Sequence, residues 1–236
     1  MIRVSERVNL HPPRAQLGKF VAGELSVGLS TVMAAHLEYC AECQQARANL
    51  EANLAADWQA TDATAVAVDE AIFSAILDRI VEQPQQSSAV PAESVSHEVV
   101  IDNKAVSLPR VLAKVAATGL SWKQLPGGIS QALVELDDRT KCEFIYMPPG
   151  SKAPAHTHRG NEVMLVLDGV FSDELGNYKV ADFVMRDPSH KHQPRTQDGC
   201  LCFSVLDSPL VFTEGWLRLL NPFNRLMFSQ RKRSSH

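Results

Sequence analysis

The chain has 236 residues, of which 45% are hydrophobic and 21% charged, and a formal net charge of −4. This is the composition of a globular protein with one large domain or two small ones. The sequence lacks an uncharged apolar run of roughly 18 residues, and its first residues carry charges and prolines where a signal peptide needs an apolar core, so we expect a cytoplasmic protein without a membrane span.

The first third of the chain is rich in alanine and has the apolar spacing of helices. A first helix is expected to end at Gly23, and Ser26 or Ser30 is placed to cap a second helix that runs to about Tyr39. A third helix is expected over residues 41–58. These patterns predict an all-α N-terminal domain.

A fourth helix is expected from Asp69, because an acidic side chain suits a helix N-terminus. Its apolar residues form a wide stripe that must be buried against another surface: Ile72, Phe73, Ile76, Leu77, Ile80 and Val81. Residues 1–83 contain 6 Lys and Arg against 11 Asp and Glu, a balance of −5, whereas the remainder has a balance of +1. An acidic N-terminal part suits a basic protein partner better than nucleic acid, although a merely soluble acidic domain has the same balance.

Residues 82–94 have the composition of a linker, with two prolines, three glutamines and three serines. After Val99, short β-branched and aromatic runs alternate with Pro and Gly breaks about every ten residues, which predicts an all-β sandwich or barrel. We therefore expect an α+β chain of two domains, a helical domain with its linker at residues 1–88 and a β domain at residues 89–236.

One histidine and two cysteines lie close together at the end of the second predicted helix. His36 and Cys40 share a helix face, and Cys43 follows at CxxC spacing. One imidazole and two thiolates suit tetrahedral zinc, and His11 is the other histidine available in this domain. A thioredoxin-like redox pair has the same CxxC spacing, but it stands at a strand-to-helix junction, whereas this pair follows a helix.

His11-Pro12, followed by His36-x3-Cys40-x2-Cys43, resembles the zinc-binding anti-sigma family, in which LVAxHLxxCxxC recurs much as VMAAHLEYCAEC stands here. The resemblance implies a zinc-clipped helical bundle that binds an extracytoplasmic-function sigma factor and blocks its contacts with RNA polymerase. It also implies that the fourth helix contacts the sigma factor through Ile72, Phe73, Ile76, Leu77 and Ile80. The alternative is that this face folds back on its own helices or on the β domain.

A second group of candidate ligands lies in the β domain. His156 and His158 are two residues apart and point to one face of a strand, and Glu162 joins them if the strand continues. A fourth ligand must come from another strand, and His190 and His192 are the candidates. Three imidazoles and one carboxylate suit zinc, iron, manganese, nickel or copper, so the ligand types alone do not select the metal.

The stretch from Gly150 to Gly169 resembles the first cupin motif at every fixed position, which implies a jelly-roll barrel. The second cupin motif is looser. GNYKVADFVMRDPSHKHQP has Asp187 where the family usually has Pro and Ser189 where it usually has Gly, but it keeps the last histidine, His192. This register favours His192 over His190 as the fourth ligand.

A zinc anti-sigma domain joined to a single cupin resembles the ChrR family over about residues 8–225. The resemblance implies an anti-sigma factor that inhibits a sigma factor of the RpoE type and releases it on oxidative stress, notably singlet oxygen. The helical domain would inhibit, and the cupin would be required for the response. We expect structural zinc at His11, His36, Cys40 and Cys43. We expect a second divalent metal, zinc in preference to iron, manganese or nickel, at His156, His158, Glu162 and His192.

Two other functions fit the cupin. Similar sets of three histidines and one glutamate carry dioxygenases and isomerases, but no general acid or base stands near these ligands, and an enzyme leaves the N-terminal zinc motif unexplained. A cupin that senses a small molecule without oxidation is the other alternative. We expect a regulator and no enzymatic activity. Cys200 and Cys202 share a strand face and are interpreted as buried core residues, with a redox pair or extra metal ligands near the cupin site as the alternatives, and Cys142 is also interpreted as a core residue.

Overall fold

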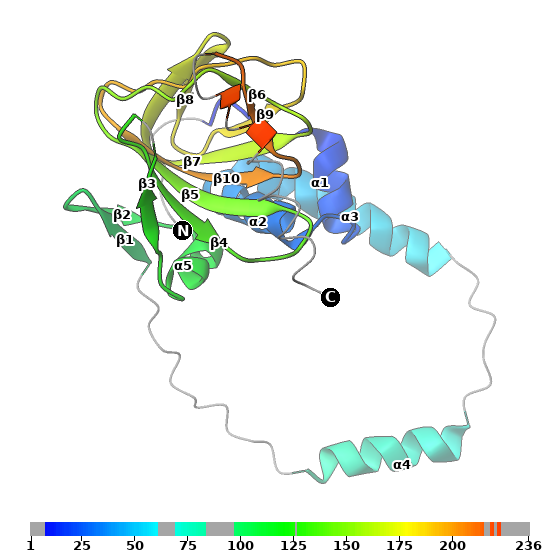
Figure 1. The fold of residues 1–236 in the computed structure, drawn as a ribbon. Coiled ribbons are helices and arrows are strands. Elements are labelled where there is room, and N and C mark those ends of the chain that lie inside the picture. The colour runs from blue at the N-terminus through cyan, green and yellow to red at the C-terminus, as the bar shows by residue number, and fades with distance from the viewer. Residues whose placement is uncertain are drawn as a thin grey trace.

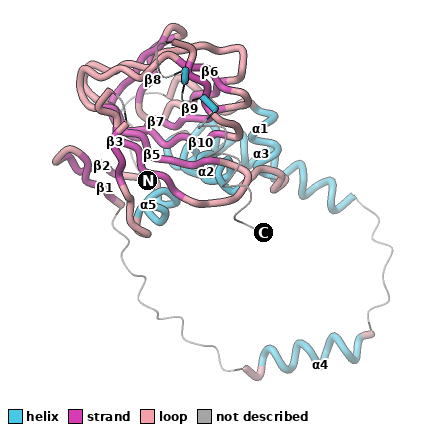
Figure 2. The backbone as a smooth tube through the Cα atoms, viewed as in Figure 1, coloured by secondary structure: helices cyan, strands magenta, loops and turns pink. Residues whose placement is uncertain are grey.

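The computed structural model describes residues 8–60, 69–83, 97–125, 127–214, 218–219 and 221–222. Helices occupy the first part of the chain and strands most of the remainder (Figures 1 and 2). The four predicted helices are present as α1 (Arg14–Val21), α2 (Val27–Tyr39), α3 (Ala41–Ala60) and α4 (Glu70–Val81). The predicted linker is described only at residues 82 and 83, and the predicted domain boundary after residue 88 lies outside the described residues.

Side-chain caps set the starts of two helices. The Ser26 hydroxyl accepts a hydrogen bond from the Leu29 amide, so Ser26 and not Ser30 caps α2. Asp69 accepts from the amides of Ala71 and Ile72 at the start of α4. The cap at Asp69 confirms the predicted start of α4.

The strands are antiparallel throughout the described residues. The main sheet has the order β3-β4-β5-β10-β7-β8 with β9 also paired to β7, and β1-β2 and β11-β6 form two smaller sheets. The strands are β1 (Glu98–Ile101), β2 (Lys104–Ser107), β3 (Trp122–Gln124), β4 (Ser130–Val134), β5 (Lys141–Met147), β6 (His156–His158), β7 (Glu162–Asp173), β8 (Gly176–Lys179), β9 (Phe183–Arg186), β10 (Cys200–Leu206) and β11 (Leu210–Phe212).

One helix was not predicted: α5 (Arg110–Ala116) lies in the part expected to be all β. It starts after Pro109 and buries Leu112 and Ala113 beside α2. Seven residues make about two helical turns, too few for a periodic signal, and the preceding proline resembles a strand break.

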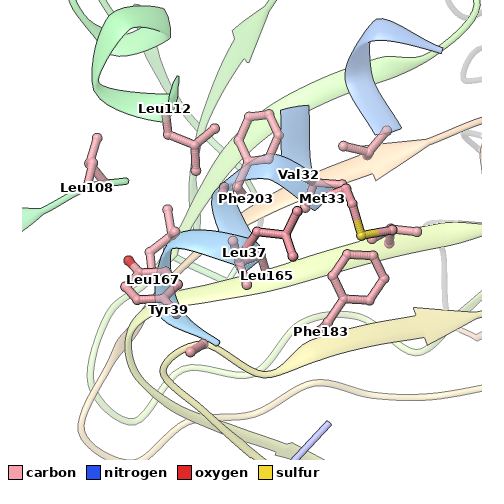
Figure 3. Close-up of a cluster of buried hydrophobic side chains, with 14 of the residues drawn as sticks. Val32, Met33, Leu37, Tyr39, Leu108, Leu112, Leu165, Leu167, Phe183 and Phe203 are labelled. Carbon is pink, nitrogen blue, oxygen red and sulfur yellow. The ribbon is translucent and has the colours of Figure 1, made fainter. Parts of the chain in front are cut away.

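Helix α2 lies at the centre of the hydrophobic core, packed against α1 and α3, against α5, and against β7 and β10. It is buried almost all round, in keeping with its apolar composition. Figure 3 shows its side chains packed with those of α5 and the sheet in one cluster: Val32, Met33, Leu37, Tyr39, Leu108, Leu112, Leu165, Leu167, Phe183 and Phe203. The helical and β regions therefore share one core.

The start of α2 approaches the sheet closely at Gly28. A Cβ there would lie 2.4 Å from the Thr140 hydroxyl and 2.5 Å from the Cys142 sulfur. The Gly28 amide donates to the Asp137 carboxylate at 2.8 Å, which attaches the helix N-terminus to the β4–β5 loop. A Cβ at this position fits only if the helix or the side chains of Thr140 and Cys142 shift.

Replacing Gly28 by alanine is expected to lower the free energy of unfolding by about 1–3 kcal/mol, because α2 or the packed side chains of Thr140 and Cys142 must shift to admit the added Cβ. Gly18→Ala in α1 is the matched control, since nothing lies within 4 Å of its Cβ position. The control is expected to raise stability by about 0.5–1 kcal/mol through helix propensity. Urea unfolding of both variants measures the difference, and equal effects would contradict the close contact.

Helix α4 differs from α2 in being exposed on all sides. None of its residues is buried, and Ile76, the least exposed of its large apolar residues, is 46% exposed. Figure 1 shows α4 apart from the sheet and the other helices. The alternative in which its apolar face folds back on the chain is therefore not what the structure shows. Among the described residues no helix is both long and apolar enough to cross a membrane.

Candidate metal centres

The first candidate site joins three segments of the helical region. His11 precedes α1, His36 lies in the last turn of α2, Cys40 stands between α2 and α3, and Cys43 is in the first turn of α3. One potential ligand atom from each residue lies within 4.8 Å of all the others. His11 Nδ1 is 3.3 Å from the Cys40 sulfur and 3.4 Å from the Cys43 sulfur. The structure thus brings together all four residues that the sequence predicted.

The histidine orientations leave a lone pair directed at the thiols. His36 Nδ1 donates to the Ala181 carbonyl at 2.9 Å, so Nε2, 3.4 Å from the Cys43 sulfur, is free to act as a ligand. His11 Nε2 lies 3.7 Å from a Glu42 oxygen, which leaves Nδ1 for the site. Two imidazoles and two thiols in this arrangement fit a tetrahedral zinc ion.

Burial keeps the side chains of His36 and Cys43 uncharged at neutral pH when no metal is bound. Burial, and then the neighbouring Cys40, raise the pKa of the Cys43 thiol to about 12. Burial lowers the pKa of His36 to about 4, although its hydrogen bond to Ala181 opposes the change. At neutral pH the imidazole of His36 is therefore already deprotonated, whereas Cys43 must release a proton when it binds a metal.

The second candidate site lies among the strands of the β region. His156 and His158 are in β6, and Glu162 begins β7. The strand does not continue from His158 to Glu162, because residues 159 and 160 form a bend, so Glu162 reaches the site from the start of a second strand. His192 lies opposite His156, and the two exchange backbone hydrogen bonds of 3.1 and 3.0 Å. Potential ligand atoms of all four residues lie within 4.8 Å of one another, and each residue is at most 6% exposed.

Acceptor atoms converge at this second site. The Nδ1 atoms of His156 and His192 donate to the Pro154 carbonyl at 2.8 Å and to Asp173 at 3.1 Å, so both rings present Nε2 lone pairs. His158 Nε2 is 3.1 Å from His192 Nε2 and 3.1 Å from Glu162 Oε2. That Glu162 oxygen makes no hydrogen bond of normal geometry within the described part of the chain. Converging lone pairs and a buried carboxylate fit a bound cation.

Glu162 is held in its ionised form. Burial alone would raise its pKa, but His158, whose Nε2 lies 3.1 Å from Glu162 Oε2, and then the charges of the other two histidines lower it to about 2. The Ser204 hydroxyl also donates to Glu162 Oε1 at 3.1 Å. Burial and the neighbouring His192 lower the pKa of His156 to about 4. A carboxylate and a neutral imidazole are therefore available as ligands at neutral pH.

The second candidate for the fourth ligand points elsewhere. His190 Nδ1 lies 2.9 Å from an Asp187 oxygen, and its side chain is 35% exposed. Asp187 also accepts from the Ser189 amide at 2.9 Å, so the two departures from the cupin motif form a side-chain-capped turn. The structure places His192, and not His190, with the other three residues.

The hydrogen-bond network that orients the His192 ring was not predicted from the sequence. Asp173 accepts hydrogen bonds from His192 Nδ1, from the Tyr178 hydroxyl at 2.7 Å and from Arg186 Nη2 at 3.0 Å. Burial alone would raise the pKa of Asp173, but these hydrogen bonds have the larger effect and lower the pKa below its usual value, so that the carboxylate stays ionised. In the sequence, Asp173 stands in SDELGN and resembles an ordinary turn residue.

The three remaining cysteines are buried, with exposures of 0% for Cys142, 1% for Cys200 and 3% for Cys202. This agrees with their interpretation as core residues. Within the described residues they are not members of either metal-ligand group.

The metal-free protein is expected to lose stability as the pH falls from about 6.5 to about 4. In this range the unfolded state binds protons at His36 and His156, whereas burial keeps both neutral in the folded state. Each shift corresponds to about 3 kcal/mol at most, and the part of the loss that is due to the two histidines is complete below about pH 4. Chemical unfolding of the chelator-treated protein across this range measures the effect, and stability that rises on acidification would contradict it.

Three comparisons with known proteins agree with this architecture. Residues 111–208 match the family described as the ChrR cupin-like domain. Anti-sigma-E factor ChrR of Cereibacter sphaeroides is 30% identical over 221 residues, which cover 92% of this chain and 98% of that protein. The crystal structure of Rhodobacter sphaeroides SigE in complex with the anti-sigma ChrR matches with 26% identity and a TM-score of 0.66, covering 85% of this chain and 99% of that one.

Proposed function

The chain belongs to the ChrR family of anti-sigma factors, and on this premise we propose that it binds an extracytoplasmic-function sigma factor of the RpoE type and keeps it from RNA polymerase. The likeness extends over nearly the whole chain. One of the similar structures is that of an anti-sigma ChrR in complex with the sigma factor SigE. Cytoplasmic localisation follows from this function, because sigma factors act where RNA polymerase does.

The observation that carries the proposal is the uncovered apolar face of α4. Its five central apolar residues are 46–61% exposed and lie on one side of a capped helix: Ile72, Phe73, Ile76, Leu77 and Ile80. An amphipathic helix with such a face binds in an apolar groove of a partner protein. The acidic balance of residues 1–83 complements a basic partner surface.

The two metal sites have different proposed roles. Zinc at the first site supplies a crosslink between the segment before α1 and the start of α3, and it thereby orders the helices that bind the sigma factor. A second divalent metal, with zinc favoured, would be held by His156, His158, Glu162 and His192. Because these residues are at most 6% exposed, a small uncharged oxidant such as singlet oxygen reaches them more easily than a large organic ligand.

We infer that the second site senses the oxidant and does not catalyse a reaction. Oxidation at or near its ligands would then alter how the β region supports the helical region, and the sigma factor would be released. Alternative functions in catalysis or small-molecule sensing predict a response to a specific substrate or ligand and none to singlet oxygen.

The test is transcription in vitro with an extracytoplasmic-function sigma factor of the RpoE type from the same organism. The metal-loaded chain is expected to inhibit sigma-dependent transcription at a one-to-one ratio, and singlet oxygen from an illuminated dye is expected to restore it. An Ala variant of Glu162, which empties the second site, is expected to inhibit more weakly than the unchanged chain and to show no further response to the oxidant. Inhibition that persists unchanged under illumination would contradict the sensing role, and no inhibition at any ratio would contradict the anti-sigma role.

A further inference from the structure

Residues 178–186, here called the bridge segment, contact the partners of both candidate metal sites. The segment runs from the end of β8 through a corner at residues 180–182 into β9. Both strands pair with β7, β8 with its end and β9 with its beginning. The segment therefore lies along β7 with both of its ends near the second site and its corner, which pairs with Val166, against the helical region.

The two ends of the bridge segment hold the His192 ring. Asp173 accepts from His192 Nδ1 at 3.1 Å, and the same carboxylate accepts from Tyr178 in β8 at 2.7 Å and from Arg186 in β9 at 3.0 Å. Tyr178 and Arg186 also contact each other. Because Asp173, Tyr178 and Arg186 are at most 8% exposed, a change in the position of His192 must be accommodated by these neighbours.

The corner of the bridge segment holds the first site. The Ala181 carbonyl accepts from His36 Nδ1 at 2.9 Å. Asp182, which is 0% exposed, accepts from the amides of Asn9 and Leu10 at 2.9 and 3.1 Å, directly before His11. Two of the four residues of the first site thus depend on the corner for their position.

The corner itself is a strained element. Ala181 has a φ of 75°, a left-handed conformation that residues with a Cβ rarely adopt. Its amide donates to the Val166 carbonyl at 2.9 Å, and Asp182 accepts from the Lys179 amide at 3.0 Å. Contacts from β7, β8 and the helical region together maintain this conformation, so loss of one group of contacts is expected to loosen the others.

We propose that the bridge segment couples the two sites, so that disruption of the second site displaces Tyr178 and Arg186 and loosens the corner that holds His36 and residues 9–10. This inference rests on the proposed function, because it names the route by which a change in the cupin reaches the helical region. By linkage the coupling is reciprocal, so metal at one site strengthens metal binding at the other.

The experiment uses the full chain loaded with zinc alone, without a sigma factor. Glu162→Ala empties the second site, and the readouts are the rate of zinc release from the first site to a chromophoric chelator and hydrogen exchange at the amides of residues 9 and 10. In the otherwise unchanged chain, Glu162→Ala is expected to raise both rates about tenfold. In an Asp182→Asn background, it is expected to change zinc release less than about twofold.

Two further variants make the test specific. Tyr178→Phe removes only the hydroxyl that bonds Asp173 and keeps the ring packed on Phe171 at 4.7 Å, and it is also expected to abolish the coupling. Asp137→Asn is the matched control, because Asp137 also binds an α2 amide but stands on the β4–β5 loop. In the Asp137→Asn background, Glu162→Ala is expected still to raise the rate of zinc release about tenfold.

Several results would overturn the inference. One is an Ala variant of Glu162 that releases zinc from the first site no faster than the unchanged chain. Another is a tenfold effect of Glu162→Ala on zinc release that persists in both the Asp182→Asn and the Tyr178→Phe backgrounds. A third is loss of this effect in the Asp137→Asn background as well. If Asp182→Asn does not fold, Tyr178→Phe decides. Since no sigma factor takes part, failure of the anti-sigma function would leave these results unaffected.

Discussion

Replacing Cys43 by alanine is expected to abolish zinc binding at the first site and to weaken the complex with the sigma factor about 100-fold or more. The site joins the segment before α1 to the start of α3, and a structural zinc site contributes about 10 kcal/mol or more to folding. Helix α2 should stay in place, because its core contacts and the bond from Gly28 to Asp137 do not involve the metal. The loss is therefore expected in α1 and α3.

Cys142→Ala is the matched control for this variant. Cys142 is 0% exposed and belongs to the core, but it is not a member of either metal-ligand group. The control is expected to keep both metals and full sigma affinity, with a loss of about 1 kcal/mol in stability. Calorimetric titration with the sigma factor measures the affinity, and a Cys43→Ala chain that binds as tightly as the control would contradict structural zinc.

Truncating the apolar face of α4 is expected to separate binding from folding. The double change Phe73→Ala and Ile76→Ala should weaken the sigma complex by about 100-fold or more, since buried anchor residues at protein interfaces contribute about 2 kcal/mol or more each. The same change should alter the free energy of unfolding by less than about 0.5 kcal/mol, because both side chains are exposed in the free chain, by 60% and 46%.

Asp78→Ala on the opposite face of α4 serves as the control, and it is expected to leave the sigma complex within about threefold of the unchanged chain. Surface plasmon resonance and urea unfolding on the same preparations give the two quantities. If the double variant loses stability as well as affinity, α4 packs on its own chain in solution and the proposed contact is wrong.

The helices and both ligand groups could be predicted from the sequence because their signals are local. Ser26 and Asp69 cap helices by contacts with residues at most three positions away. His36, Cys40 and Cys43 are placed by helical spacing, and His156 and His158 by strand alternation. The His192 register also followed from a local motif, and the structure agrees with it.

The remaining features depend on contacts between distant parts of the chain. The burial of α2 on the sheet, the close approach at Gly28 and the joint between Asp182 and residues 9–10 connect residues more than 100 positions apart. No pattern along the sequence marks Asp182 or Asp173, because an acidic residue in a turn is common and its partners are unknown until the strands are paired. The short helix α5 was missed for lack of length.

The most direct test of the account is the metal content of the purified complex between this chain and its sigma factor, measured by mass spectrometry of the elements. We expect two metal ions per complex. One of them is zinc at the first site, which an Ala variant of Glu162 retains, and the complex with Cys43→Ala is expected to be too weak to purify. A tight complex that forms without zinc would contradict the claim that the metal-ordered helical region binds the sigma factor.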